Sequence, residues 1–228
     1  MRATRAHPRG YHARMKATGL LAVWNRIAPE HEAQFNAWYE AEHLDERMAI
    51  PGFHSARRYR ASREPHAYAA MYELEGPGVL QTPAYLHLLA NPTPRTRSIM
   101  PHFLDMNRAA CAVAFDSAPG MAPVRHLAIL ALNDASAVPT EPFDEVRVRL
   151  AVPDVAATGG TTPEQQLRGS TDRVPPPFLL VEGESERAVS ACCARLCAQL
   201  GAYAPRSFTL LSARAHGATS LPAELPQL

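Results

Sequence analysis

The chain has 228 residues, of which 46% are hydrophobic and 20% charged, and its formal net charge is +1 at pH 7. This balance is ordinary for a globular protein, and the absence of a strong basic field argues against a nucleic-acid-binding protein. No run approaches the roughly 18 apolar residues that a membrane span requires. We therefore expect neither nucleic acid nor a membrane as a partner.

The N-terminus is basic and contains no acidic residue before residue 30. It is not followed by the apolar stretch of an export signal. We predict that residues 1–17 form a disordered basic arm. The cysteines Cys111, Cys192, Cys193 and Cys197 are not spaced like a disulfide framework. They are typical of reduced thiols, which predicts a cytoplasmic protein.

The first two predicted elements are a buried strand over Gly19–Ile27 and a helix from about Pro29 to Met48. A regular α-helix would place one continuous face toward the core. The residues on that face are Phe35, Trp38, Tyr39, Glu42 and Glu46. Pro51-Gly52 is expected to end the helix, because proline disfavours helical geometry before it and glycine permits a turn.

The next elements complete a strand, helix, strand, strand, helix, strand order, which is the split βαβ motif. They are strands over Phe53–Ala61 and Ala67–Leu74, a helix over Thr82–Ala90 and a strand over Phe103–Phe115. Alternation in the second strand separates Arg57 and Tyr59 on one face from Arg58 and Arg60 on the other. We assign residues 18–116 to this first domain.

A linker at residues 117–123 precedes an eroded version of the same pattern at residues 124–214, followed by a tail at 215–228. We expect strands over Val124–Leu132, Gln165–Asp172, Phe178–Glu182 and Arg206–Ala213, and a helix over Glu184–Leu200. The segment Phe143–Val152 alternates like a strand, although its position favours a helix.

These elements predict an α+β fold of two tandem ferredoxin-like βαββαβ units packing sheet to sheet as an α/β barrel. Each four-stranded sheet carries its helices on one side and leaves the other face apolar, and packing two such faces together buries both. Two halves of one chain can do this alone. Further association into a homodimer is left open.

The segment NRIAPEHEAQFNAWYEAEHLDERMAIPGFHSARRYRA, with YAAMYEL and SIMPHFLDMNRAACAVAF after it, resembles bacterial dimeric α/β-barrel proteins of the EthD-like kind. The resemblance covers about residues 18–116. Its sharpest elements are Trp38-Tyr39-x-x-Glu42-His43, Pro51-Gly52-Phe53 and Arg57-Arg58-Tyr59. It implies a small hydrophobic organic ligand, bound between the first helix and the sheet. Residues 120–214 lack a counterpart of the Trp-Tyr-x-x-Glu-His motif, so one pocket per chain is expected.

Glu42 and His43 are the predicted catalytic residues of such a pocket. Burial of Glu42 on the apolar helix face would favour a general base, and the imidazole of His43 titrates near neutrality and suits proton transfer. The predicted substrate-binding residues are Trp38, Tyr39, Arg58, Tyr59, Tyr72 and Tyr85.

Each of these residues also has a structural interpretation. Glu42 with Arg58 would form an ion pair anchoring the helix to the sheet, and the aromatic side chains would pack in the core. Cys193 and Cys197 are spaced i, i+4, but no further ligand flanks them, so we predict no metal and no other cofactor.

The favoured function is a cofactor-independent enzyme acting by proton transfer on a small aromatic or polyketide-like molecule, as a cyclase, isomerase or lyase. Two alternatives stay open: a cofactor-free or haem-linked monooxygenase, and a non-catalytic binding or accessory protein for a small hydrophobic ligand.

Overall fold

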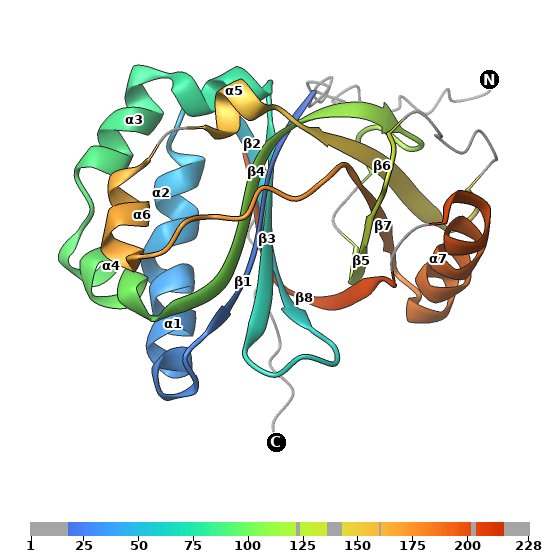
Figure 1. Cartoon of the computed structure of the whole chain (residues 1–228), viewed down its shortest axis with the longest axis horizontal. Coiled ribbons are helices and arrows are strands. Elements are labelled where there is room, and N and C mark those ends of the chain that lie inside the picture. The colour runs from blue at the N-terminus through green and yellow to red at the C-terminus, as the bar shows by residue number, and fades with distance from the viewer. Residues whose placement is uncertain (1–17, 122–123, 136–142, 160, 202–203, 217–228) are drawn as a thin grey trace, which may run out of the picture.

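A computed structural model describes residues 18–121, 124–135, 143–159, 161–201 and 204–216. The predicted basic arm, residues 1–17, lies outside the described residues, and so does most of the predicted tail. In the part that is described, no helix is both long and apolar enough to cross a membrane. The strands form a closed antiparallel barrel with helices on two opposite sides (Figure 1).

The first half has the predicted order of elements. Its strands are β1 (Gly19–Ile27), β2 (Phe53–Ala61), β3 (Ala67–Leu74) and β4 (Phe103–Asp116). Its helical segments are η1 (Pro29–His31), α1 (Glu32–Trp38), η2 (Tyr39–His43), α2 (Leu44–Met48), η3 (Pro77–Gln81), α3 (Pro83–Ala90), α4 (Pro94–Ile99) and η4 (Met100–His102). The first three strands have the predicted bounds, and β4 is one residue longer.

Local sequence explains where these helices begin and end. Pro29 and Pro83 each occupy a first-turn position, where the missing N–H costs no hydrogen bond. The Thr82 hydroxyl accepts from the Tyr85 amide and caps α3. Gly52 has φ +91°, which a residue with a side chain rarely adopts, so it supports the turn from the first helix into β2.

The second half contributes β5 (His126–Ala131), β6 (Val146–Pro153), α5 (Val155–Thr158), α6 (Pro163–Arg168), β7 (Phe178–Gly183), α7 (Glu186–Leu200) and β8 (Arg206–Ala215). The ambiguous segment Phe143–Val152 is mainly strand β6. The described residues between β5 and β6 contain no helix, whereas a full βαββαβ unit has one there.

The predicted strand Gln165–Asp172 is wrong, because residues 163–168 form helix α6. Thr162 and Gln165 make a reciprocal capping box, and Pro163 stands in the first turn. Gly169 then ends the helix in the left-handed conformation, at φ 67°. The Thr162-Pro163-Glu164-Gln165 sequence is itself a helix-start signal, which outweighs the weak alternation that suggested a strand.

The eight strands close in the order β1-β3-β2-β8-β5-β7-β6-β4. The two halves have the same internal strand order, β4-β1-β3-β2 in the first half and β8-β5-β7-β6 in the second. The halves join where β2 pairs with β8 and β4 pairs with β6, both antiparallel. The predicted α+β barrel fold is therefore confirmed.

The barrel interior holds an apolar cluster to which all eight strands contribute, including Trp24, Tyr59, Met71, Phe178 and Phe208. The same interior contains a second group, which we call the barrel cluster. Its members are Arg57, Arg147, Arg149, Glu73, Asp116 and Glu182. Three cations and three anions pair there.

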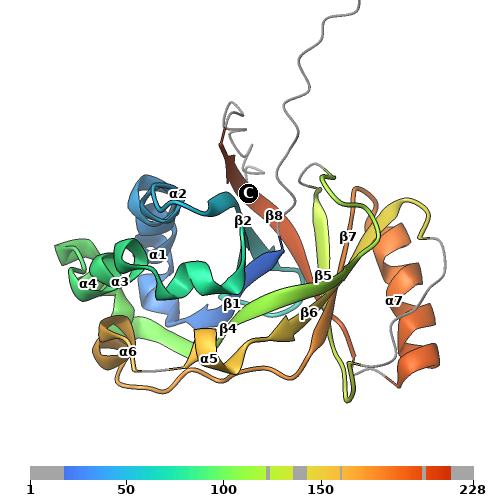
Figure 2. The same ribbon diagram turned by 90° about the horizontal axis from the view of Figure 1, so that it is seen from above.

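The connection from β6 to β7 leaves the second half and carries α5 and α6 onto the helical layer of the first half. Helix α5 packs against β4 and η3, and α6 packs against α3 and η4, on the side of the barrel away from α7 (Figures 1 and 2). Backbone hydrogen bonds hold the returning chain, since Arg173 bonds to Met106 and Arg108 on β4. The helical layer of the first half therefore contains residues from both halves.

Candidate functional site

The helix that runs from residue 29 to residue 48 is interrupted by a π-helical turn at Tyr39–His43. Such a turn holds one residue more than an α-helical turn, and π-turns are frequent at functional sites. The extra residue shifts every later position by about 100° relative to a regular helix. His43 and Arg47 therefore face the sheet, where regular spacing predicted Glu42 and Glu46.

The exposed fractions of the side chains agree with this rotated helix register. His43 is 7% exposed and Arg47 is 3% exposed, whereas Glu42 is only half-buried. The Glu42 carboxylate accepts hydrogen bonds from the hydroxyls of Thr93 and Thr96 at the start of α4. The predicted orientation of Glu42 toward the sheet is thus wrong, and its carboxylate ties the first helix to α4.

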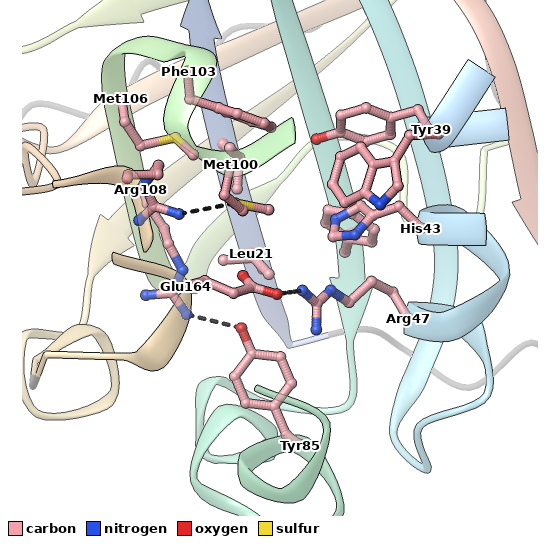
Figure 3. A pocket seen from close by; sticks show the side chains of 14 residues that line it. Leu21, Tyr39, His43, Arg47, Tyr85, Met100, Phe103, Met106, Arg108 and Glu164 are labelled. Carbon is pink, nitrogen blue, oxygen red and sulfur yellow. Dashed lines mark hydrogen bonds and ion pairs between the residues drawn. The ribbon is translucent and has the colours of Figure 1, made fainter. Parts of the chain in front are cut away.

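A pocket opens between this helix, the outer face of β1, β3 and β4, and helix α6 (Figure 3). Its lining residues are Leu21, Val23, Trp38, Tyr39, His43, Arg47, Tyr72, Tyr85, Met100, Phe103, Met106, Arg108, Glu164 and Arg168. The cavity measures about 40 Å³. That space suits a few water molecules, while a benzene-sized ligand needs roughly 150 Å³. An organic ligand must therefore displace part of the wall.

His43 is held between aromatic rings. Its imidazole lies 4.2 Å from the Trp38 ring and 4.9 Å from the Tyr39 ring, measured between centroids. Its Nδ1 is buried without a hydrogen-bond partner in the described structure. Burial, with the charges of Arg47 and Arg58, holds the pKa of His43 well below its ordinary value. The imidazole is therefore neutral at neutral pH and has a nitrogen available to accept a proton.

Arg47 lies one turn beyond His43 and reaches across the pocket to the second half. Its Nη2 donates to Glu164 Oε1 on α6 at 2.6 Å, and its Nη1 is buried without a partner in the described residues. Burial would lower the pKa of Arg47, but the Glu164 carboxylate together with Tyr85 and Tyr72 outweighs this and raises it. Arg47 therefore stays charged inside a largely enclosed site.

Two further arginines line the pocket. Arg168 Nη2 donates to Asp172 Oδ1 at 2.5 Å and Nη1 contacts Met100 Sδ at 3.6 Å, while its Nε is buried without a partner in the described chain. Arg108 Nη2 donates to the Tyr85 hydroxyl at 2.9 Å. Of the four ionised side chains in the lining, three are arginines and one is Glu164, which gives the pocket a positive character.

Three predicted tyrosines line the pocket: Tyr39, Tyr72 and Tyr85. Burial raises the pKa of Tyr39, and burial with the nearby Tyr39 hydroxyl raises that of Tyr72 well above its ordinary value. Both phenols are therefore neutral and able to donate a hydrogen bond. Trp38 also lines the pocket, and its indole Nε1 donates to Thr96 Oγ1 at 3.1 Å.

The other two predicted binding residues do not line the pocket. Tyr59 points into the barrel interior, as the alternation of β2 requires. Arg58 faces the helices, but it stacks against the rings of Phe35, Tyr39 and Tyr68 at 4.5–5.1 Å.

The predicted ion pair of Arg58 with Glu42 is wrong. Arg58 bonds to Asn36 and to Glu40, the latter at 3.3 Å. The π-turn explains the difference, because Glu40 precedes the extra residue and Glu42 is rotated past the sheet.

No three His, Cys, Asp or Glu side chains are grouped to hold a metal ion within the described ranges. Cys193 and Cys197 lie in α7, where Cys193 is buried in the apolar cluster between that helix and the second-half strands. They are remote from the pocket, since α7 lies on the opposite side of the barrel.

Sequence reasoning missed the charged residues of the pocket: Arg47, Arg108, Glu164 and Arg168. Arg47 had a signal, because it follows His43 by four residues and shares its helix face. Glu164 and Arg168 had none, because only the barrel closure brings α6 beside the first helix.

Comparison with known proteins finds similarity in structure alone. No protein-family model matches the sequence, and no curated protein matches it. An anthrone oxidase-like protein of known structure is 12% identical, with 92% of this chain and 99% of the other covered and a TM-score of 0.50. A candidate monooxygenase from Lactobacillus acidophilus NCFM is 9% identical, with 90% and 99% covered and a TM-score of 0.52. At such identities these likenesses show that the chain shares its barrel fold with both proteins.

Proposed function

We propose that the protein is a cofactor-independent enzyme that acts by proton transfer on a small aromatic or polyketide-like molecule, with His43 as the general base. The observation that carries the proposal is the His43 imidazole, which is neutral, buried at the pocket wall and without a partner on Nδ1. The lowered pKa keeps the imidazole unprotonated but also makes it a weak base, so the proposed proton transfer depends on nearby cations to stabilise the anion that forms.

The surroundings suit the anion that proton removal creates. Removing a proton next to a ketone, or from a phenol, leaves negative charge on oxygen. Arg47 and Arg108 would stabilise that charge in a site shielded from water, where such interactions are stronger. Trp38 and Phe103 supply flat apolar walls for a ring. The EthD-like resemblance of the first half remains a prediction consistent with such a ligand.

A monooxygenase is the second candidate, supported by the names of the two structural neighbours. Removal of a proton is also a suitable first step for it, because an electron-rich carbanion can react directly with O₂. Anthrone then gives anthraquinone and water, with one O₂ consumed per molecule. The two candidates share His43 and differ in whether oxygen is used.

Anthrone is a suitable probe, because its methylene protons are acidic and exchange is visible by NMR. In D₂O without oxygen, the wild-type protein should accelerate loss of the methylene signal. His43→Ala should reduce that rate by about 10²–10⁴-fold, the usual contribution of a general base. Oxygen uptake in air would identify the monooxygenase.

Two control variants isolate the role of His43. His87→Ala removes an exposed histidine of α3, and Glu42→Gln removes the carboxylate bonded to α4; both should retain the rate. A His43→Ala variant that is folded and fully active would refute the proposal. Wild-type binding of anthrone without any exchange or oxidation would favour the non-catalytic binding protein.

A further inference from the structure

The contact between Arg47 and Glu164 has a feature that a simple structural ion pair does not require. It is formed across the pocket by side chains 117 positions apart, one from each half of the chain. Glu164 lines the cavity and is the one carboxylate in that lining. Figure 3 shows it reaching from the α6 side toward Arg47, between His43 and Tyr85.

Three buried nitrogen atoms in the lining lack a hydrogen-bond partner in the described residues: His43 Nδ1, Arg47 Nη1 and Arg168 Nε. A buried charged group without its full set of partners is costly, so such atoms mark a place where a ligand completes the bonding. Two of the three belong to arginines, and a guanidinium pairs best with a planar group bearing two oxygens.

The cavity of about 40 Å³ is too small for an organic ligand, so at least one lining side chain has to move when such a ligand enters. Met100 and Met106 are flexible and adapt to different shapes. Glu164 is different, because its carboxylate already satisfies Arg47, so a ligand that replaces it must offer an equivalent group. A neutral ligand that displaced Glu164 would leave Arg47 buried with its charge uncompensated, so a neutral probe such as anthrone has to bind with Glu164 still in place.

We propose that the natural substrate is a small planar organic molecule bearing one carboxylate, and that this carboxylate takes the place of Glu164 on Arg47. The Glu164 side chain then acts as an internal stand-in for the substrate and keeps Arg47 paired until the substrate arrives. This inference rests on the proposed function for the identity of the site, and it adds the charge of the substrate.

The test compares 2-naphthoate with 2-naphthamide, which have the same ring and nearly the same size but differ in charge. Calorimetric titration of the full chain should show tighter binding of naphthoate by about ten-fold, the scale of one charged hydrogen bond. Equal affinity for the two probes, or no naphthoate binding at millimolar concentration, would overturn the proposal. This comparison uses the wild-type protein and needs no variant to fold.

Two variants then assign the preference to named residues. Glu164→Gln removes the competing carboxylate and should widen the preference for naphthoate by about a further ten-fold. Arg47→Gln should abolish it. Glu184→Gln makes the same charge change at an exposed position before α7 and should leave the preference unchanged. A preference that stays the same in both pocket variants would overturn the assignment.

The outcome is separable from that of the proposed function. Naphthoate preference without any proton exchange or oxidation in the wild-type protein would refute catalysis and leave the carboxylate site standing. Proton exchange that depends on His43, without a preference for naphthoate, would support catalysis and refute the carboxylate site. His43→Ala should keep the preference for naphthoate, because Arg47 and not the His43 imidazole is proposed to bind the carboxylate.

Discussion

The barrel cluster and the pocket each gather three arginines, yet they differ in how the charges are paired. In the barrel cluster, Arg147 pairs with Asp116 at 2.7 Å and Arg149 pairs with Glu182 at 2.8 Å. Three acids there balance three bases. In the pocket lining, Glu164 is the one carboxylate beside three guanidinium groups, and Arg168 has a further counter-charge in Asp172, which is not part of the lining.

The difference separates two uses of the same residue. Paired arginines inside a barrel join strands of both halves, because Glu182 on β7 and Glu73 on β3 bond to arginines from β2 and β6. In the pocket, the unpartnered nitrogens of Arg47 and Arg168 belong to residues that line a cavity beside a neutral base, which suits a ligand, whereas the unpartnered Nε of Arg57 belongs to the barrel interior. Burial alone does not distinguish them, since Arg47 and Arg57 are both almost fully enclosed.

The largest expected effect is on stability, from Glu182→Gln. Glu182 is fully buried and accepts from Arg57 and Arg149, so its loss leaves these two buried cations with Glu73 as their remaining shared counter-charge. Breaking a buried ion pair costs about 3–5 kcal/mol of unfolding free energy. Urea denaturation measures this directly.

The matched comparison is Glu164→Gln in the pocket. Its stability loss should be clearly smaller, because α6 is a short surface helix that can adjust and admit water to Arg47. Exposed Glu184→Gln should change stability by no more than about 0.5 kcal/mol. If Glu182→Gln and Glu164→Gln lost the same unfolding free energy, the proposed difference between the barrel cluster and the pocket arginines would be contradicted.

The second prediction concerns the stability of the folded protein at acid pH. Burial would raise the pKa of Glu73, but Arg57, Arg149 and Arg147 outweigh it and hold the pKa far below its ordinary value. Unfolded Glu73 binds a proton more readily, so this stabilisation is complete above about pH 5 and declines as the pH falls toward the folded value. The urea midpoint should therefore drop steeply below pH 5. Glu73→Gln should flatten that decline, and an unchanged slope would contradict the role of the barrel cluster.

The third prediction concerns the protonation of His43. Burial and the charges of Arg47 and Arg58 lower its pKa, so NMR of the imidazole nitrogens should show a neutral ring at about pH 6. Arg47→Gln removes one of the causes and should raise the His43 pKa. A titration midpoint at or above 6.5 in the wild-type protein would contradict the electrostatic environment assigned to His43 by its burial and by Arg47 and Arg58.

The smallest expected effect comes from deleting Ala41, an exposed residue inside the π-turn. A regular α-helix through the shortened segment would still direct His43 and Arg47 to the sheet, so naphthoate binding should persist. Deleting exposed Asp45 instead keeps the π-turn and rotates Arg47 away by about 100°. Binding should then be lost, and equal behaviour of the two deletions would contradict the assigned helix register.

The sequence predicts the barrel well where hydrophobic periodicity is strong. The bounds of β1, β2 and β3 and the alternation of Arg57 with Arg58 follow from local pattern, and the structure confirms them. The capping box at Thr162 is also a local signal, and it outweighs the weak alternation over residues 165–172 that favours a strand.

The charged part of the pocket was not predictable for two physical reasons. Regular helical spacing directs Glu42 inward, and nothing in the local sequence announces the extra residue that directs His43 and Arg47 there instead. Glu164 and Arg168 depend on contacts between segments more than a hundred residues apart, which periodicity cannot report.

The route of the chain between β6 and β7 also has a consequence for folding during synthesis. The aromatic wall of the pocket is made early, by residues up to 108, but its cover on α6 follows only after the second half has begun to pair. Contacts of such long separation form late, because a large loop must first be closed. A ribosome-bound chain that stops before residue 163 would expose Arg47 and His43 to solvent, so pocket binding would report the docking of α6 from the second half onto the first half.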